Sequence, residues 1–388
     1  MNFKTQMEDY QSQQSDSQFP FQYEEWKRMA KEKLNGANFD YVAAGAGSED
    51  TIHENTESFK RWRIQPRMFK DVKNRDISVS VLNKQFSSPV FMAPVGVQTI
   101  LHEEGDMASA KAAAELDVPF VCSSVSAHSM EEIGEAMGKN ATKWFQLYWS
   151  KDLNIAASFL QRAEKAGYSA IVLTLDTPMV GWRERDLNHR WLPFLEGIGI
   201  ANYTSDPVFR KRMTVDPEED LEAAGEQFRQ IFGNTTLTWD DIEFVRENTD
   251  LPIILKGILH PHDAELALQY GVDGVVVSNH GGRQINGEIA AIDALPRITK
   301  VIQGRMPVLM DSGIRRGDDV FKALALGADA VLVGRPYLYG LAVGGEEGVK
   351  RVIRNLLGDF ELTMGLAGVD KISEINPTLL YDSKYGDR

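Results

Sequence analysis

Cysteine and positive charge are both scarce in this sequence. Cys122 is the only cysteine among 388 residues, which excludes a disulfide within the chain and favours a reducing compartment. Lysine and arginine together number 42, against 56 aspartates and glutamates, so the formal net charge is −14. Nucleic acid and anionic membrane surfaces repel a chain this acidic, and we expect neither as a partner.

Long apolar runs are missing as well. No stretch reaches the roughly 20 apolar residues that a membrane-spanning helix needs. The first 20 residues are polar, rich in Gln and Ser, and lack the apolar core of a signal peptide. We therefore expect a cytoplasmic protein with a polar N-terminal tail at 1–22 and a single domain at 23–388.

The chain does contain a regular alternation of short apolar segments with helical ones. The apolar segments are rich in β-branched residues throughout, which is typical of a parallel sheet covered on both faces. Eight such units predict a (β/α)₈ TIM barrel. The alternative is a doubly wound sheet, which the absence of G-x-G-x-x-G after the first strand disfavours. The expected strands are 90–94, 120–124, 144–148, 170–176, 253–256, 274–278, 307–311 and 330–334, and the last expected helix is about 349–357.

Two regions fall outside this alternation. Residues 23–70 precede any strong strand; helical patterns at 23–34, around 44–47 and at 56–62 predict an N-terminal helical cap, followed by a small hairpin at 77–82. After the fourth strand the alternation stops for about sixty residues, 178–237. That is far longer than an ordinary βα loop, and its mixed, partly aromatic composition predicts a partly ordered active-site lid.

The stretch 277–284 joins the end of a buried strand to a polar, glycine-rich turn. His280 has an ordinary pKa near neutrality and is the natural base there. Arg283 is a planar cation suited to a carboxylate, and Gly281 and Gly282 permit close backbone approach. The stretch predicts chemistry on a hydroxy or keto acid. The alternative is a histidine satisfied within a helix-capping turn.

The other strand ends are polar too, and in a TIM barrel these ends meet at the active-site face. Buried polar groups must satisfy one another or a ligand. Lys256 at a strand end indicates an anionic partner or an electron-rich ring. The loops at 311–317 and 333–335 predict a phosphate site made of glycine amides, a helix N-terminus and Arg335, against the alternative of turn glycines with solvated arginines.

The stretch 278–284, Ser-Asn-His-Gly-Gly-Arg-Gln, resembles the signature of the FMN-dependent α-hydroxy-acid oxidases and dehydrogenases. The resemblance covers about 23–380, and further matching motifs lie at 145–148, 173–178, 255–257, 311–315 and 334–336. Within that family, the stretches 94–97, 181–183, 202–209 and 260–263 most resemble the bacterial lactate 2-monooxygenases. Val125 stands where glycolate oxidase has a tryptophan.

The resemblance implies a role for each polar strand end. By this resemblance His280 is the base and Asp176 is its partner. Arg183 and Arg283 bind the substrate carboxylate, and the hydroxyls of Tyr41 and Tyr148 also bind the substrate. Tyr148 is placed both in the catalytic set, with His280, Asp176 and Arg283, and in the substrate site. The implied FMN ligands are Pro94, Val95, Gly96, Ser123, Gln146, Thr174, Lys256 and Ser278 around the flavin ring, and Asp311, Gly313, Arg315, Gly334 and Arg335 around the ribityl chain and phosphate.

The resemblance also implies the reaction. We expect FMN-dependent oxidation of L-lactate by dioxygen in a homo-oligomer, a tetramer or octamer, with no metal. Relatives that release peroxide generally have alanine where this chain has Gly96, which favours oxidative decarboxylation to acetate, carbon dioxide and water. The alternatives are an oxidase that releases the 2-oxo acid and hydrogen peroxide, a flavin-barrel isomerase, and a silent FMN-binding protein.

Overall fold

Eight parallel strands close into a barrel in the computed structural model, which describes residues 6–7, 10, 19–384 and 386. Most of the predicted 1–22 tail lies outside the described residues. The order around the barrel is β10-β11-β4-β5-β6-β7-β8-β9, so the predicted (β/α)₈ barrel is confirmed. The strands are β4 (Val90–Met92), β5 (Phe120–Ser123), β6 (Lys143–Leu147), β7 (Ile171–Thr174), β8 (Ile253–Lys256), β9 (Gly274–Val277), β10 (Val308–Met310) and β11 (Ala330–Val333).

The barrel interior is filled by alternate side chains of these strands. Phe91 and Trp144 lie edge to face, with ring centroids 4.9 Å apart, and both are buried. The hairpin of β2 (Val79–Val81) and β3 (Lys84–Phe86), near the predicted 77–82, adds Val79, Val81 and Phe86 to this cluster. Both faces of each barrel strand are therefore buried, which explains the continuous apolar runs in the sequence.

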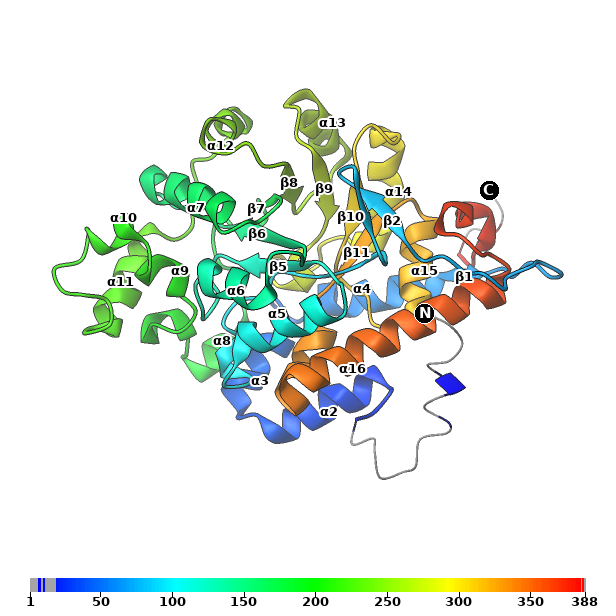
Figure 1. Ribbon diagram of the computed structural model, residues 1–388, viewed down its shortest axis with the longest axis horizontal. Helices are drawn as coiled ribbons and strands as arrows, with labels where there is room; N and C mark the ends of the chain where they lie inside the picture. The colour runs from blue at the N-terminus through cyan, green and yellow to red at the C-terminus, as the bar shows by residue number, and fades with distance from the viewer. Residues whose placement is uncertain (1–5, 8–9, 11–18, 385, 387–388) are drawn as a thin grey trace.

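Helices surround the barrel, as Figure 1 shows. They are α5 (Gly105–Glu115), α6 (Met130–Met137), α7 (Leu153–Lys165), α12 (Ile242–Asn248), α13 (Pro261–Gln269), α14 (Ala291–Ile302), α15 (Gly317–Ala325) and α16 (Arg335–Ala367). The last is much longer than the predicted 349–357 and has non-helical backbone at Gly344 and Gly345. In the described part of the chain, no helix combines the length and apolarity that crossing a membrane requires.

The N-terminal cap consists of α2 (Tyr23–Lys33), α3 (Gly36–Ala43) and α4 (Asp50–Arg61), and α2 lies beside α16 (Figure 1). Strand β1 (Trp62–Ile64) pairs with β12 (Leu380–Asp382), which joins the two ends of the domain. The predicted helix around 44–47 is wrong. Helix α3 ends at Ala43, and the Ala44 carbonyl accepts hydrogen bonds from Arg283 and Arg335 instead of continuing the helix.

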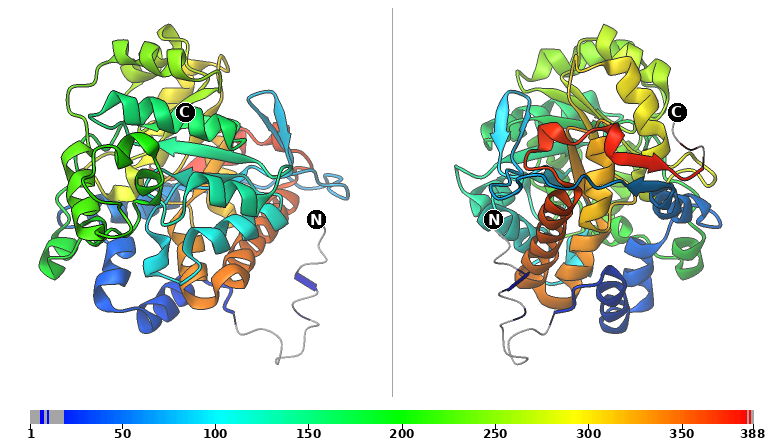
Figure 2. Two further views of the ribbon diagram at one scale, coloured as in Figure 1. Left: turned by 60° about the vertical axis from the view of Figure 1, so that its left-hand side comes forward. Right: turned by 90° about the vertical axis from the view of Figure 1, so that its right-hand side faces the viewer.

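The insertion between β7 and α12 has the partial order that its composition predicts. It contains α8 (Glu184–His189), α9 (Ala201–Thr204), α10 (Pro207–Arg210) and α11 (Leu221–Ile231), and it forms the green lobe at the left of Figure 1. Tyr203 and Phe209 are buried, and α11 buries Ala224, Phe228 and Ile231. Helix α10 packs against α7, whereas α8 packs against α3 of the N-terminal cap; in the left view of Figure 2 the green helices of the insertion lie outside the barrel.

Candidate active site

A cavity opens at the carboxyl ends of the barrel strands. Fourteen of the predicted site residues line it: Tyr41, Pro94, Val95, Gly96, Tyr148, Arg183, Lys256, His280, Arg283, Asp311, Gly313, Arg315, Gly334 and Arg335. The other five, Ser123, Gln146, Thr174, Asp176 and Ser278, are not in its lining. They are hydrogen-bonded to one another or to lining residues, as described below.

His280 is held in one orientation by hydrogen bonds on both ring nitrogens. Its backbone has a φ of 55°, a left-handed conformation that is uncommon outside glycine, at the turn after β9. Nδ1 lies 2.7 Å from Asp176 Oδ1 and 3.2 Å from Thr177 Oγ1, which itself donates to Asp176 over 2.9 Å. Nε2 lies 3.3 Å from the Tyr148 hydroxyl. The carboxylate thus fixes Nδ1, and Nε2 faces the cavity.

The electrostatics of this group favour a neutral imidazole beside a carboxylate. Burial lowers the pKa of His280 by more than the Asp176 carboxylate raises it. Burial alone would raise the pKa of Asp176, but His280 and Lys256 hold it well below its usual range. Below neutrality, therefore, His280 remains able to accept a proton while its partner stays ionised.

Lys256 is the buried cation of this group. Its ammonium donates to Ser278 Oγ over 2.9 Å and lies 3.3 Å from Asp176 Oδ2 and 3.6 Å from Asp311 Oδ2. Burial would lower the pKa of Lys256, but the two carboxylates outweigh that effect and raise it. The lysine that the sequence places at a strand end is therefore charged and paired, as a buried lysine must be.

Two arginines lie along one wall of the cavity. Arg283 Nη1 donates to the carbonyls of Tyr41 and Ala44 over 2.6 and 2.9 Å, and Arg183 donates to the Arg283 carbonyl and Gln284 Oε1 over 3.1 Å each. Burial and the neighbouring Arg283 lower the pKa of Arg183 to about 10, so it remains charged. Two cations with no ion-pair partner within the described part of the chain suit an anionic ligand.

The far end of the cavity fits a phosphate. Arg335 is held by three main-chain carbonyls, those of Val42, Ala44 and Gly281, over 2.8–2.9 Å. Arg315 has a buried Nε with no hydrogen-bond partner among the described residues. Gly334 also lines this end, and a Cβ placed on it would make ordinary van der Waals contacts with Ala93 and Val95 at 3.8 Å. An unpaired donor and two arginines match the phosphate end of a flavin mononucleotide.

The α15 N-terminus, however, does not contribute as expected. Asp319 Oδ2 accepts from the amides of Arg315 and Arg316 over 2.9 and 3.1 Å, and Asp359 Oδ2 accepts from Gly317 N over 2.7 Å. These carboxylates satisfy the amides that the prediction assigned to a phosphate. A phosphate at this end would therefore be held by the arginines and the loop glycines rather than by that helix end.

A row of polar side chains crosses three neighbouring strands at the same barrel face. Gln146 Oε1 accepts from Ser123 Oγ over 3.1 Å and from Ser124 N over 3.2 Å, while its amide donates to Thr174 Oγ1 over 3.0 Å. The parallel register puts Ser123 opposite Gln146. The predicted ring ligands of β5, β6 and β7 thus form one connected group.

Several lining residues are absent from the predicted set. Thr177 bridges Asp176 and His280. The feature of the sequence that could have indicated this role is its position directly after Asp176. Ser312 Oγ accepts from Gly281 N over 2.9 Å and joins two strand-end loops. Phe194 and Phe232 come from the insertion, and no pattern in that stretch indicates which of its aromatic residues reach the cavity.

The comparisons with known proteins agree on one family. Residues 30–382 match the family described as FMN-dependent dehydrogenase. An L-lactate oxidase of Lysinibacillus sphaericus is 43% identical over 362 residues, which are 93% of each chain. An L-lactate oxidase of Nostoc sp. is 42% identical and covers 93% of this chain and 98% of its own. The crystal structure of a mandelate oxidase has a TM-score of 0.82 at 36% identity, covering 93% of this chain and 98% of that one.

Proposed function

We propose, from the premise that this chain belongs to the FMN-dependent dehydrogenase family, that it oxidises L-lactate and decarboxylates the product before release. FMN is its cofactor, and oxidation of a 2-hydroxy acid is the activity that the curated relatives support. The observation that carries the proposal is the hydrogen-bonded pair of His280 and Asp176 beside two arginines that form no ion pair within the described part of the chain.

The arginines orient the substrate. A carboxylate bound by Arg183 and Arg283 places the adjacent hydroxyl carbon toward His280, and the Tyr41 and Tyr148 hydroxyls supply further hydrogen bonds. Burial raises the pKa of Tyr148 to about 12, so its hydroxyl keeps its proton as a donor. Fixing the substrate by several contacts lowers the entropic part of the barrier.

The base then acts at one atom. His280 Nε2 takes the proton of the substrate hydroxyl, and the ionised Asp176 stabilises the imidazolium that results. When bound, FMN supplies the acceptor for the two electrons of the Cα–H bond. We propose that the flavin ring is held by 94–96, Ser123, Gln146, Thr174, Lys256 and Ser278, and that the ribityl chain and the phosphate are held by Asp311, Gly313, Arg315, Gly334 and Arg335.

The proposed product depends on the space beside Gly96 and on retention in the cavity. Val97 N donates to the Val125 carbonyl over 3.0 Å, and a Cβ on Gly96 would lie 2.3 Å from that same oxygen. The missing methyl lets the two loops close on each other. Phe194 and Phe232 of the insertion line the cavity and support retention of pyruvate beside the hydrogen peroxide that forms when dioxygen takes up the two electrons. The two react to give acetate, carbon dioxide and water.

A second candidate is an L-lactate oxidase that releases pyruvate and hydrogen peroxide. The contact of Gly96 with Val125 favours it, because close packing of these two loops is by itself a reason for glycine. Quantifying acetate and carbon dioxide against pyruvate and peroxide after L-lactate turnover separates the two. Stoichiometric peroxide from the unmodified protein would establish the oxidase.

Gly96→Ala sharpens this test. The φ of Gly96 is not positive, so alanine is allowed there, but its methyl must displace Val125. We expect turnover to shift toward free pyruvate and peroxide, with anaerobic flavin reduction by L-lactate kept within a few-fold. An unchanged product ratio would show that Gly96 does not determine the product.

Three further properties stand as proposals. We propose that the protein is a homo-oligomer, a tetramer or octamer. We also propose a cytoplasmic location, because a single, buried and unpaired cysteine, Cys122, is compatible with a reducing compartment. We also propose that parts of the 178–237 insertion act as a lid. The position of Val180, Phe194 and Phe232 in the cavity wall supports that role.

A further inference from the structure

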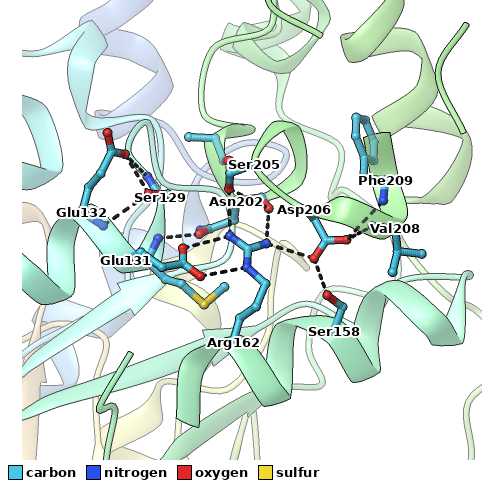
Figure 3. Close-up of polar contacts among 12 residues, drawn as sticks. Ser129, Glu131, Glu132, Ser158, Arg162, Asn202, Ser205, Asp206, Val208 and Phe209 are labelled. Atoms are coloured by element: carbon cyan, nitrogen blue, oxygen red, sulfur yellow. Dashed lines mark hydrogen bonds and ion pairs between the residues drawn. The ribbon is translucent and has the colours of Figure 1, made fainter. Parts of the chain in front are cut away.

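One section of the insertion, 201–210, is bound tightly to the barrel's outer helices, and we call it the anchor segment. Arg162 of α7 donates to the Asn202 carbonyl over 2.8 Å, to Ser205 Oγ over 2.8 Å and to Asp206 Oδ2 over 3.0 Å (Figure 3). The same guanidinium pairs with Glu131 of α6 over 2.9 Å. One arginine therefore connects α6, α7 and the insertion.

Asp206 is the acidic centre of the anchor segment. Its Oδ2 also accepts from Ser158 Oγ of α7 over 2.6 Å, and its Oδ1 caps α10 by accepting from Val208 N and Phe209 N over 2.8 and 3.1 Å (Figure 3). The side chain is fully buried, and all these contacts compensate its charge. Such a buried, completely paired carboxylate holds the segment in one position.

Asn202 extends from this fixed segment to the end of β5. Its side chain is fully buried, and its Oδ1 accepts from Met130 N over 2.7 Å. Its amide donates to the carbonyls of Ser123 and Ser124 over 3.2 and 3.3 Å and to Ser126 Oγ over 2.9 Å. All its hydrogen-bonding capacity goes to the strand-end loop at 123–130.

That loop carries part of the cavity wall. Ser123 Oγ donates to Gln146 and accepts from Val125 N over 3.2 Å, and Ser124 Oγ accepts from Tyr148 N over 3.1 Å. Val125 lines the cavity and meets the 94–97 loop through its carbonyl. The backbone amides of Val125 and Tyr148 are thus each hydrogen-bonded to a serine whose carbonyl Asn202 holds, Ser123 and Ser124 respectively.

An aromatic row makes a second connection between the anchor segment and the cavity. Tyr203 packs against Phe159 of α7 at 4.8 Å between ring centroids and against Phe228 of α11 at 4.9 Å. Phe228 in turn packs against Phe194 at 5.2 Å and Phe232 at 4.9 Å, the two insertion aromatics in the cavity wall. The anchor segment is therefore tied to the cavity by side chains as well as by Asn202.

We infer that Asn202 is a positioning residue for the oxidation: through the carbonyls of Ser123 and Ser124 it sets where Val125 and Tyr148 stand in the cavity. The inference needs only FMN-dependent oxidation of a 2-hydroxy acid and is independent of the proposed decarboxylation. A consequence is that the insertion does not open as one lid hinged at its two ends. The anchor segment stays on the barrel, and movement is left to the stretches on either side of it.

The test compares Asn202→Asp with Ser205→Ala. Asn202→Asp keeps the acceptor for Met130 N and replaces the donor with an anion facing two carbonyls. Ser205→Ala removes one contact with the same Arg162 on the same helical turn and leaves β5 untouched. Two quantities are measured on each protein: the dissociation constant of FMN from the apoprotein, and the rate of anaerobic flavin reduction at varied L-lactate concentration.

For Asn202→Asp we expect the half-saturating L-lactate concentration to rise and the limiting reduction rate to fall, each about tenfold, and the FMN dissociation constant to rise about fivefold. Ser205→Ala stays within twofold on all three. Ser126→Ala, which removes one of the acceptors, gives a smaller shift in the same direction and serves if Asn202→Asp does not fold. Wild-type values for Asn202→Asp, or for Ser126→Ala where that variant is used instead, with only the melting temperature lowered, would show that Asn202 is merely structural. If L-lactate fails to reduce the wild-type flavin, the proposed substrate is wrong, and FMN affinity still decides the role of Asn202.

Discussion

The two ends of the cavity hold their positive charges in different ways. At the catalytic end, Lys256 lies 3.3 Å from Asp176 and 3.6 Å from Asp311, so two carboxylates compensate one ammonium. At the phosphate end, Arg335 donates, among the described residues, only to main-chain carbonyls. Carbonyl dipoles hold a guanidinium in place without cancelling its charge. The first end is thus suited to moving a proton, and the second remains positive and suited to a bound anion.

Removing the base at the catalytic end has the largest expected effect. His280→Gln leaves no group there that accepts a proton near neutrality, and general-base assistance is worth roughly 10²- to 10⁴-fold. We expect flavin reduction by L-lactate to fall by at least about 100-fold in stopped-flow mixing. The FMN content stays that of the wild type, because the phosphate end is unchanged. Reduction at the wild-type rate would show that the base lies elsewhere.

Removing the uncompensated cation is the reciprocal change. Arg335→Met should raise the FMN dissociation constant of the apoprotein about 100-fold, the scale of one or two charge-assisted hydrogen bonds. In the fraction that carries FMN, His280 and Asp176 are unaffected, so the reduction rate stays within a few-fold. Fluorescence titration measures the affinity. An unchanged dissociation constant would mean that the charge of Arg335 serves only to hold the N-terminal cap.

Arg283 is also held by carbonyls, since its Nη1 donates to those of Tyr41 and Ala44, but its proposed ligand is the substrate carboxylate. Arg283→Lys keeps the charge and loses the planar fork. We expect the half-saturating L-lactate concentration to rise about 10- to 100-fold and the limiting reduction rate to fall by a smaller factor. Steady-state and anaerobic kinetics measure the two. A change in the rate alone would separate Arg283 from carboxylate binding.

The pH dependence is the mildest expected contrast. The neutral imidazole is the active form, and burial lowers its pKa from the ordinary 6.5. The value of kcat/KM for L-lactate should therefore stay level above pH 6.5 and decline only as the pH falls through the lowered pKa. Arg335, whose pKa burial lowers to about 10, remains charged over the same range. A decline that begins above pH 6.5 would contradict a buried neutral base.

The sequence predicts the barrel well because its signal is local and repeated. Continuous apolar segments indicate strands covered on both faces, and the strand-end polar residues fall at one face by topology alone. The ends of β7 and β9 lie on either side of β8, so Asp176 and His280 come within 2.7 Å although 104 positions separate them. The proximity of Asp176 to His280 is thus what a (β/α)₈ barrel predicts for these two strand ends.

What the sequence does not predict depends on contacts between distant segments. The alanines at 43, 44 and 46 favour a helix, yet α3 ends at Ala43, and the next carbonyl, that of Ala44, accepts from Arg283 and Arg335. Asp319 and Asp359 accept from the amides at the start of α15, and no local pattern in the sequence predicts these contacts. Phe194 and Phe232 reach the cavity from an insertion whose sequence does not indicate which of its residues do so.

The carbonyl partners of Arg335 also determine how far this site tolerates mutation. A carbonyl oxygen belongs to every residue type, so the acceptors at Val42 and Ala44 survive any substitution that fits the space and leaves the end of α3 in place. Asp176 and Asp311 act through side chains, and no other residue keeps both their length and their charge. Substitution is therefore tolerated at Val42 and Ala44, which hold Arg335 through their main chain, and not at Asp176 and Asp311, which pair with Lys256 through their side chains.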